Sequence, residues 1–309
     1  MEENLHPTVP HSPLDDQGSK ATSSGGLIRL RTRLTEPTTW LGPAWACLCG
    51  VVASGGFDWQ NGDWIRLALL ILLVDGGWGT LWAALGSTDW ATPLRHWRNW
   101  RLSEPSAALP YTLPNSPGDR ASRWMGQLRA WWRDALWPTC GPAISSVIVA
   151  LPVTALLGIL LGPELLLLSA AALAITQLGL AWEGGRGTAT PGWDAIIAVA
   201  LPWLAGHIAF GGSPTSHSIG LAVAFALAWG SAWRFKSAGG RILGVGGQLL
   251  AATLLIALYH PLAAGSLLLL IVPQLALIPW LWRGQSASWY VRHARPWLMA
   301  AMMIAAGAL

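Results

Sequence analysis

The sequence predicts an all-α integral membrane protein, and its composition, apolar stretches and charge placement all indicate this class. Hydrophobic residues make up 53% of the 309-residue chain and charged residues only 11%, whereas soluble domains carry about a quarter charged residues. Apolar stretches follow one another from about residue 40 onward, and most approach the roughly 20 residues that a helix needs to cross a bilayer. We therefore expect a bundle of membrane-spanning helices.

The N-terminal segment differs from the rest of the chain. Residues 1–26 are rich in Pro, Ser, Gly and Asp and contain no apolar run, so they offer too little surface to form a core. They also lack the apolar stretch of a signal peptide. We predict a disordered tail over 1–26 and one polytopic membrane domain over 27–309.

Nine membrane-spanning helices are expected in this domain. Their predicted ranges are 40–57, 64–86, 142–161, 164–182, 193–211, 217–233, 243–260, 262–282 and 294–309. Single prolines, Pro163 and Pro261, mark the junctions between two pairs of neighbouring spans. Proline interrupts the hydrogen bonding of a helix interior, so we divide each of these apolar stretches into two spans.

The basic residues give the orientation of these spans. An N-terminus in the cytoplasm puts every Lys and Arg except Arg66 on the cytoplasmic side, as the positive-inside rule requires. All but two of the 19 basic residues are arginines, and the net charge is +4. We expect this basic surface to face lipid headgroups or phosphates and not nucleic acid, which would need a clustered soluble domain.

The longest loop, 87–141, is predicted to be cytoplasmic and to contain an amphipathic helix over 120–137. Trp124, Trp131 and Trp132 are set against Arg123 and Arg129 in this segment. Tryptophan at headgroup depth with arginine on the lipid phosphates is typical of a helix that lies in the membrane interface. The alternative is a helix that packs against a soluble partner.

Cysteine usage and short motifs exclude several kinds of chemistry. Cys47, Cys49 and Cys140 form no CxxC pair, and the first two point to different faces of a predicted helix, so we interpret all three as packing residues. No nucleotide-binding glycine loop, hydrolase elbow, HExxH motif or nucleic-acid module is present.

Carboxylates are scarce in the predicted spans. Asp75 lies within the second span beside a cluster of glycines and is a candidate functional residue, with a structural role at a glycine-rich helix contact as the alternative. Asp75 and Asp89 would stand roughly 21 Å apart on one helix, too far to share a metal ion. The last acidic residue of the chain is Asp194. A magnesium site in the C-terminal third therefore lacks the ligands it prefers.

Four patches of the sequence carry a resemblance to a known protein family. They are 36–55 (EPTTWLGPAWACLCGVVASG), 201–206 (LPWLAG), 235–237 (FKS) followed by Gly240 and Gly244, and 288–309. Together they resemble segments of the UbiA superfamily of membrane prenyltransferases, in its chlorophyll and bacteriochlorophyll synthase branch. The resemblance implies a UbiA-type bundle of nine spans with its catalytic loops in the cytoplasm.

The resemblance also implies site positions. In that family two Asp-rich motifs hold Mg²⁺ and an isoprenoid diphosphate, and the acceptor in this branch is a chlorophyllide carboxylate. The first motif matches through Asp89 and the following Trp90, which puts Thr88, Thr92 and His96 at its three ligand positions. None of these three residues is a carboxylate.

The second motif surrounds the FKS patch, and basic residues stand where its acids are expected. This second-motif region consists of Arg234, Phe235, Lys236, Ser237 and Arg241. Arginine and lysine can hold a phosphate without a metal ion. We hypothesise a cavity that still binds lipid, a prenyl group or pigment but has lost metal-dependent ionisation; the alternative is that these charges only set the topology.

Three histidines support a second hypothesis. His207, His217 and His260 are predicted near the non-cytoplasmic ends of their spans, and a neutral imidazole can ligate the magnesium of a bound (bacterio)chlorophyll. The alternative for each is a capping or interfacial histidine.

These observations favour a non-catalytic or atypical relative of chlorophyll synthase in the cytoplasmic or a photosynthetic membrane. Such a protein would bind pigment, prenyl lipid or a photosynthetic partner complex for assembly or pigment handling. The alternative is an active prenyltransferase that esterifies a chlorophyllide or related acceptor with an isoprenoid diphosphate and requires Mg²⁺. A decayed paralogue without a distinct role is a third reading.

Overall fold

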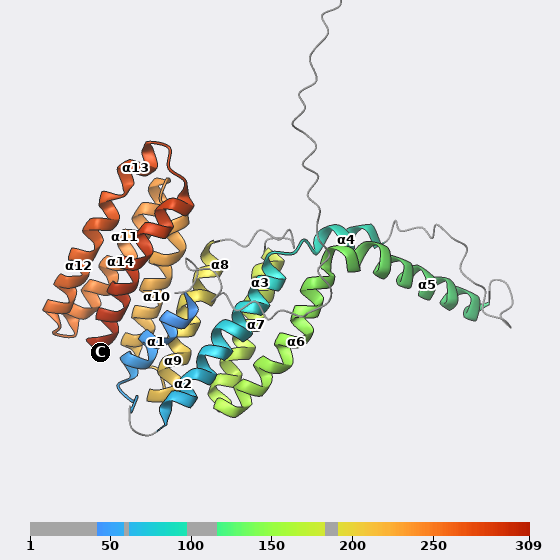
Figure 1. The fold of residues 1–309 in the computed structure, drawn as a ribbon, viewed down its shortest axis with the longest axis horizontal. Helices are drawn as coiled ribbons and strands as arrows, with labels where there is room; N and C mark the ends of the chain where they lie inside the picture. The colour runs from blue at the N-terminus through green and yellow to red at the C-terminus, as the bar shows by residue number, and fades with distance from the viewer. Residues whose placement is uncertain (1–41, 59–61, 98–115, 183–190) are drawn as a thin grey trace, which may run out of the picture.

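The computed structural model describes residues 42–58, 62–97, 116–182 and 191–309, and within these ranges the chain is helical without strands (Figure 1). The predicted tail over 1–26 lies outside the described residues. Among the described residues, six segments are long and apolar enough to cross a membrane: Asp63–Gly86, Pro117–Leu161, Pro163–Trp182, Gly192–Gly211, Ala238–Ala257 and Pro261–Trp282. The prediction of a multi-pass helical membrane protein is therefore confirmed.

These segments are built from successive helical elements, some of which contain a wider π-helical turn. The elements are α2 (Asp63–Ile71), η2 (Leu72–Gly79), α3 (Thr80–Gly86), α5 (Pro117–Trp131), η4 (Trp132–Leu136), α6 (Trp137–Leu161), α7 (Pro163–Trp182), α8 (Pro191–Ala195), η5 (Ile196–Ala200), α9 (Leu201–Gly211), α11 (Ala238–Ala257), α12 (Pro261–Ala276) and α13 (Ile278–Trp282). The breaks predicted at Pro163 and Pro261 are correct, since each proline begins a helix, where its missing N–H is tolerated.

Three further helices coincide with the remaining predicted spans: α1 (Pro43–Ser54), α10 (Ser216–Ser231) and α14 (Ala287–Gly307). α1 has 12 residues and α10 has 16, which is shorter than the roughly 20 that a spanning helix needs. α14 is longer, but Arg292 and Arg295 interrupt its apolar run. The predicted number of nine spans and the side of the N-terminus stay predictions.

α1 and α9 pack against each other more closely than side chains would allow. A Cβ added to Gly50 would lie 1.9 Å from the carbonyl oxygen of Trp203, and one added to Gly206 would lie 2.1 Å from that of Cys47. Glycines that let two backbones approach in this way are typical of helix contacts in membranes. The 201–206 patch is therefore explained in part by packing.

Two apolar cores lie on either side of this helix pair. Residues of α1, η5 and α9 contribute to both cores; α8, α10, α11, α12 and α14 complete one, and α2, η2, α3, α6 and α7 complete the other. Cys49 belongs to the first core and Cys47 to the second, which confirms that they point to different faces. All three cysteines are buried and free.

The helices run back and forth between two ends of the molecule (Figure 1). The turn between α10 and α11, with Arg234 and Lys236, and the turn between α13 and α14, with Arg283, lie at one end. The C-terminal end of α1, the N-terminal end of α2 with Arg66, and the turn between α9 and α10 lie at the other. We call the first end the basic end.

The predicted loop 87–141 contains two helices. α4 (Ala91–His96) is short, and α5 confirms a helix over the predicted amphipathic segment. The expected loop between this segment and a span starting at 142 is wrong, because α5, η4 and α6 form one continuous helix from Pro117 to Leu161. A π-helical turn just before Pro138 shifts the hydrogen-bond register, and the helix continues through the proline.

Candidate functional site at the basic end of the C-terminal helices

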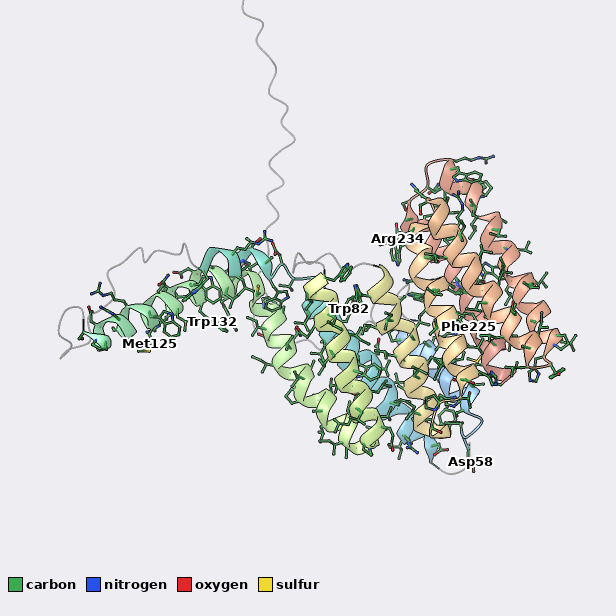
Figure 2. All side chains as sticks on the ribbon, turned by 180° about the vertical axis from the view of Figure 1, so that it is seen from behind. Asp58, Trp82, Met125, Trp132, Phe225 and Arg234 are labelled. Atoms are coloured by element: carbon green, nitrogen blue, oxygen red, sulfur yellow. The ribbon has the colours of Figure 1, made fainter. Side chains whose placement is uncertain are left out.

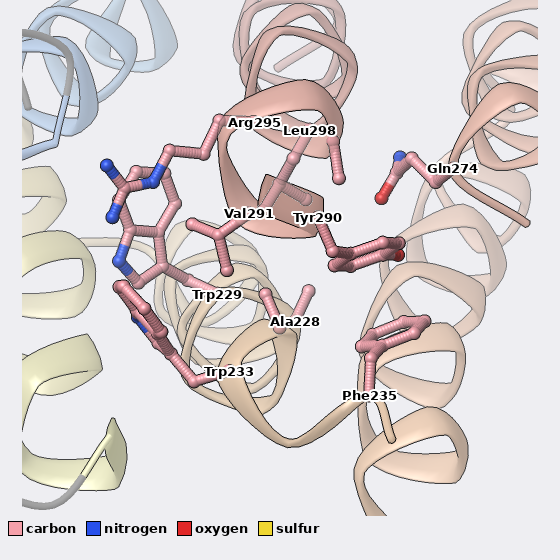
Figure 3. Close-up of a pocket in the computed structure, with 11 residues that line it drawn as sticks. Ala228, Trp229, Trp233, Phe235, Gln274, Tyr290, Val291, Arg295 and Leu298 are labelled. Carbon is pink, nitrogen blue, oxygen red and sulfur yellow. The ribbon is translucent and has the colours of Figure 1, made fainter. Parts of the chain in front are cut away.

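Phe235 anchors the turn between α10 and α11 in the protein interior. Its ring is buried and stacks on the ring of Tyr290 in α14, with centroids 4.7 Å apart (Figure 3). A Cβ on Gly244 of α11 would lie 2.4 Å from Cε2 of Phe235, so the glycine makes room for this ring. The FKS patch and its downstream glycine are thus joined by one packing contact.

Ser237 and Arg241 fix the remainder of this turn. The Ser237 hydroxyl accepts a hydrogen bond from the Gly240 N–H at 3.0 Å and so caps α11. The Arg241 guanidinium donates to the carbonyl oxygens of Phe235 and Lys236 at 3.4 and 3.3 Å. Arg241 therefore contributes to the structure of the turn, and a Cβ at Gly240 would collide with the backbone there.

Arg295 forms an aromatic cluster with two tryptophans. Its guanidinium carbon lies 4.7 Å from the ring centre of Trp229 and 6.0 Å from that of Trp233 (Figure 3). A cation over an indole face is stabilised by the ring quadrupole. The half-buried Arg295 is thereby held between α14 and the C-terminal part of α10.

A small cavity lies between the Arg295 cluster and the Phe235–Tyr290 pair. Its volume is about 10 Å³, which is room for a single water molecule. The buried Tyr290 hydroxyl has no hydrogen-bond partner in the described part of the chain. Gln274 also lines the cavity and forms two reciprocal 2.9 Å amide hydrogen bonds with Gln248.

The exposed charges that α10 to α14 contribute to this end are positive. Arg234 and Lys236 are exposed, and Arg283 and Arg292 lie on the neighbouring turn and on α14. No acidic residue follows Asp194 in the chain, so α9 to α14 supply no carboxylate to neutralise these side chains. The basic end is therefore suited to anionic groups such as phosphate.

The first-motif positions form a local helix cap. The Asp89 carboxylate accepts hydrogen bonds from the Thr92 N–H at 3.1 Å and the Thr92 hydroxyl at 2.6 Å, which begins α4. The hydrogen bonds from Thr92 hold the pKa of Asp89 below its ordinary value. Thr88 donates its hydroxyl to the Ala84 carbonyl oxygen. The His96 side chain lies outside the described residues.

The two motif regions lie in different parts of the fold. Asp89 and α4 pack against η4 and the start of α6, where Cys140 lies 3.7 Å from the Asp89 carbonyl oxygen. Phe235 belongs to a separate cluster with Tyr290. The two regions thus belong to separate packing clusters, and no group of three or more His, Cys, Asp or Glu side chains in the described ranges could hold a metal ion.

Asp75 is buried in η2, as its position in the second predicted span suggested. The π-helical turn surrounds it with glycines, and a Cβ on Gly79 would lie 3.9 Å from Asp75 Oδ1. On the same element, a Cβ on Gly77 would lie 2.6 Å from the Thr154 hydroxyl of α6. This close helix contact agrees with the structural alternative for the segment.

The three candidate pigment ligands differ in their exposure. His207 is buried, with Nδ1 3.2 Å from the Ser218 hydroxyl, which also accepts a hydrogen bond from the Trp203 indole. His217 lies in the first turn of α10, and His260 precedes α12; both are exposed.

Sequence reasoning missed most of the residues that build this site. Trp229, Trp233 and Tyr290 were not singled out, and Arg295 was counted only for topology. Trp229 and Trp233 are four residues apart in one predicted span, a spacing that places both on one helix face. The signal for Arg295 was its position inside the last predicted span, 294–309, since an ionisable residue within a span is a candidate for function.

Comparison of the chain with protein-family models, with curated proteins and with solved structures finds no match in any of the three. The resemblance to the UbiA superfamily therefore stays a prediction from the patches described above.

Proposed function

We propose that this chain is a nine-span membrane protein that binds the phosphate-bearing head group of a prenyl lipid or phospholipid at its basic end. In this account it is a UbiA-like relative of chlorophyll synthase without metal-dependent prenyl transfer. The observation that carries the proposal is the exposed pair Arg234 and Lys236 beside the Arg295–tryptophan cluster, in a part of the chain without carboxylates.

The chemistry of these side chains supports phosphate binding without a metal ion. Arginine meets phosphate with two parallel charge-assisted hydrogen bonds, and lysine adds a compact positive charge. A diphosphate held by Mg²⁺ would instead need carboxylates at this end. Asp89, the acid nearest the first-motif positions, already caps α4 and packs in another cluster.

The cavity beside the Arg295 cluster is too small for a pigment or a prenyl chain, so we place the ligand at the surface next to it. A space of about 10 Å³ cannot enclose a tetrapyrrole or a prenyl chain. A head group can nevertheless bind at the surface beside Arg234, with its chain along the exposed apolar faces of the helices. Pigment handling and a photosynthetic partner rest on the sequence resemblance alone.

The proposed topology puts the basic end in the cytoplasm. Arg234, Lys236 and Arg283 then lie in cytoplasmic turns, and Arg66 is the exception at the opposite end. This arrangement also brings the lysine and arginine side chains to the leaflet that carries anionic lipids.

A comparison of charge removal at the two ends of the molecule tests the proposal. The Arg234→Ala/Lys236→Ala double variant and Arg66→Ala are purified in mild detergent, and native mass spectrometry measures the bound phospholipid and added geranylgeranyl diphosphate. We expect a clear loss of bound lipid in the double variant and wild-type binding in Arg66→Ala. Equal binding by all three proteins would refute the proposed site. Arg241 is left unchanged because it supports the turn.

A further inference from the structure

α5 extends away from the helix bundle at the basic end. It is continuous with α6 through η4, and Figure 1 shows it running at a steep angle to the axis of α6. Because α6 belongs to a segment that is apolar enough to cross a membrane, the chain leaves the hydrocarbon core close to η4. The C-terminal end of α5 therefore lies at the depth of the lipid headgroups.

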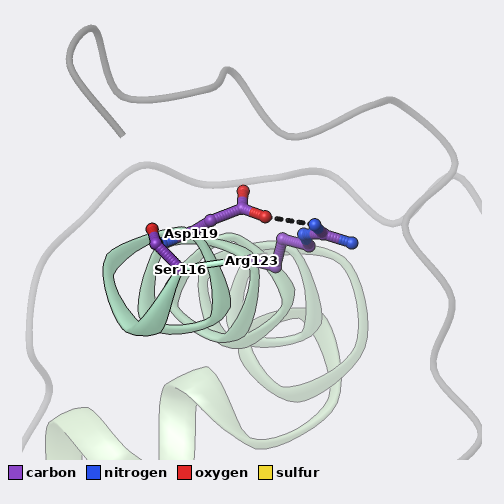
Figure 4. A network of polar contacts seen from close by, with 3 residues as sticks. All are labelled: Ser116, Asp119 and Arg123. Carbon is purple, nitrogen blue, oxygen red and sulfur yellow. Dashed lines mark hydrogen bonds and ion pairs between the residues drawn. The ribbon is translucent and has the colours of Figure 1, made fainter. Parts of the chain in front are cut away.

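One side of α5 and η4 carries the charged residues. These are Asp119, Arg120, Arg123, Arg129, Arg133 and Asp134. Asp119 and Arg123 form an ion pair one helical turn apart (Figure 4), and Arg133 pairs with Asp134 at 2.7 Å. Four arginines against two aspartates leave this side with an excess of positive charge.

The opposite side is apolar, and α4 covers only part of it. The Trp131 indole donates a hydrogen bond to the Pro93 carbonyl oxygen at 2.9 Å, and the Trp97 ring lies 5.2 Å from the Trp131 ring. Next to this contact, large side chains remain exposed. They form an apolar strip of Trp124, Met125, Trp132 and Trp137, which are between 44% and 56% exposed.

The π-helical turn makes this strip continuous with α6. Its wider winding sets residues five apart above one another, so Trp132 and Trp137 stack with centroids 6.0 Å apart. The apolar strip thus reaches the first turn of α6, where the chain enters the hydrocarbon core. In Figure 2, Met125 and Trp132 lie on the side of α5 toward which α6 extends.

We infer that α5 lies in the membrane plane, with the apolar strip at the boundary between headgroups and acyl chains and the arginines toward lipid phosphates. Indole rings favour this depth, and long arginine side chains can reach the headgroups from it. A membrane is the partner that the geometry favours, because the strip begins where α6 leaves the bilayer. This inference does not depend on lipid binding at Arg234.

Site-directed spin labelling tests the placement. Met125→Cys puts a label on the apolar strip, and Arg123→Cys puts one on the charged side of the same helix. The three native cysteines are buried, so wild-type protein treated with the label provides the background. The full chain is reconstituted in nanodiscs of phosphatidylcholine and phosphatidylglycerol, and collision rates with oxygen and with a water-soluble nickel chelate are measured.

We expect the label at 125 to meet oxygen more often than the chelate, and the label at 123 to show the reverse order. Two results would overturn the inference. Equal access of the chelate to both labels would place α5 in water, and protection of the label at 125 from both reagents would indicate a protein partner on the strip. Neither result would affect the lipid binding measured for the Arg234→Ala/Lys236→Ala variant.

Discussion

The guanidinium of Arg295 lies 4.7 Å above the ring of Trp229, and this contact joins α14 to α10 at the basic end. A cation–π pair of this kind is worth about 0.5 to 2 kcal/mol, with the larger value where the pair is desolvated. Trp229 is buried and Arg295 is half-buried. The pair is therefore both a support for the fold and a positive group next to the proposed lipid site.

Arg295→Met should lower the stability of the protein and its lipid binding together. The substitution keeps an apolar stem but removes the charge over Trp229, so we expect a loss of about 0.5 to 2 kcal/mol. Thermal unfolding in detergent measures the first effect and native mass spectrometry the second. Arg283→Met is the control, since Arg283 lies over the exposed Trp280 at 5.3 Å. An equal loss of stability in the control would contradict this assignment.

Gly50→Ala should disrupt the contact between α1 and α9. The new methyl group would lie 1.9 Å from the Trp203 carbonyl oxygen, so one helix must move away. We expect a destabilisation of a few kcal/mol, as is typical of overpacked contacts at about 1 to 3 kcal/mol. Gly246→Ala is the control, because nothing lies within 4 Å of its added Cβ, and it should be neutral or stabilising. Similar melting temperatures for both variants would refute the close crossing.

Gln248 and Gln274 should show strong thermodynamic coupling. Either single change to Leu leaves the other amide buried without its 2.9 Å partner, which costs about 1 to 3 kcal/mol. The double change to Leu removes both amides and should recover much of that loss. Unfolding of the two single variants and the double variant in detergent measures the coupling. Additive effects would mean that the amides do not act as a pair.

Asp89 should make the start of α4 sensitive to acid. Because hydrogen bonds from Thr92 lower the pKa of Asp89 in the folded state, its contribution is complete above the ordinary value of 3.8. The contribution is lost as the pH falls through the lowered value. Hydrogen exchange over 91–97, corrected for intrinsic rates, should report fraying of α4 in strong acid. Asp89→Asn keeps a capping oxygen and should remove this pH dependence; fraying of the same size in that variant would exclude Asp89 as its origin.

The sequence was sufficient for features that depend on local chemistry. Pro163 and Pro261 mark helix starts because proline lacks the N–H that a helix interior needs. Cys47 and Cys49 face different cores because helix positions two apart diverge by about 200°. The same helical periodicity places the tryptophans and the arginines of α5 on different sides of the helix.

Features that depend on distant contacts could not be predicted. Phe235 and Tyr290 stack across 55 positions of the chain, and Gln248 meets Gln274 on another helix. No periodicity within one helix specifies such pairs. The continuity of α5 with α6 was also missed, since the predicted amphipathic helix ended at 137 and the predicted span began at 142, whereas α5, η4 and α6 run without interruption.

The proposed function rests on phosphate binding without a metal ion, and one measurement tests this most directly. Purified protein is incubated with geranylgeranyl diphosphate and chlorophyllide, with Mg²⁺ or with EDTA, and mass spectrometry quantifies bound diphosphate and esterified pigment. An authentic chlorophyll synthase is assayed in parallel. We predict equal diphosphate binding in both conditions and no esterified pigment. Binding that disappears with EDTA, or an esterified pigment formed with Mg²⁺, would contradict the account and establish a metal-dependent prenyltransferase.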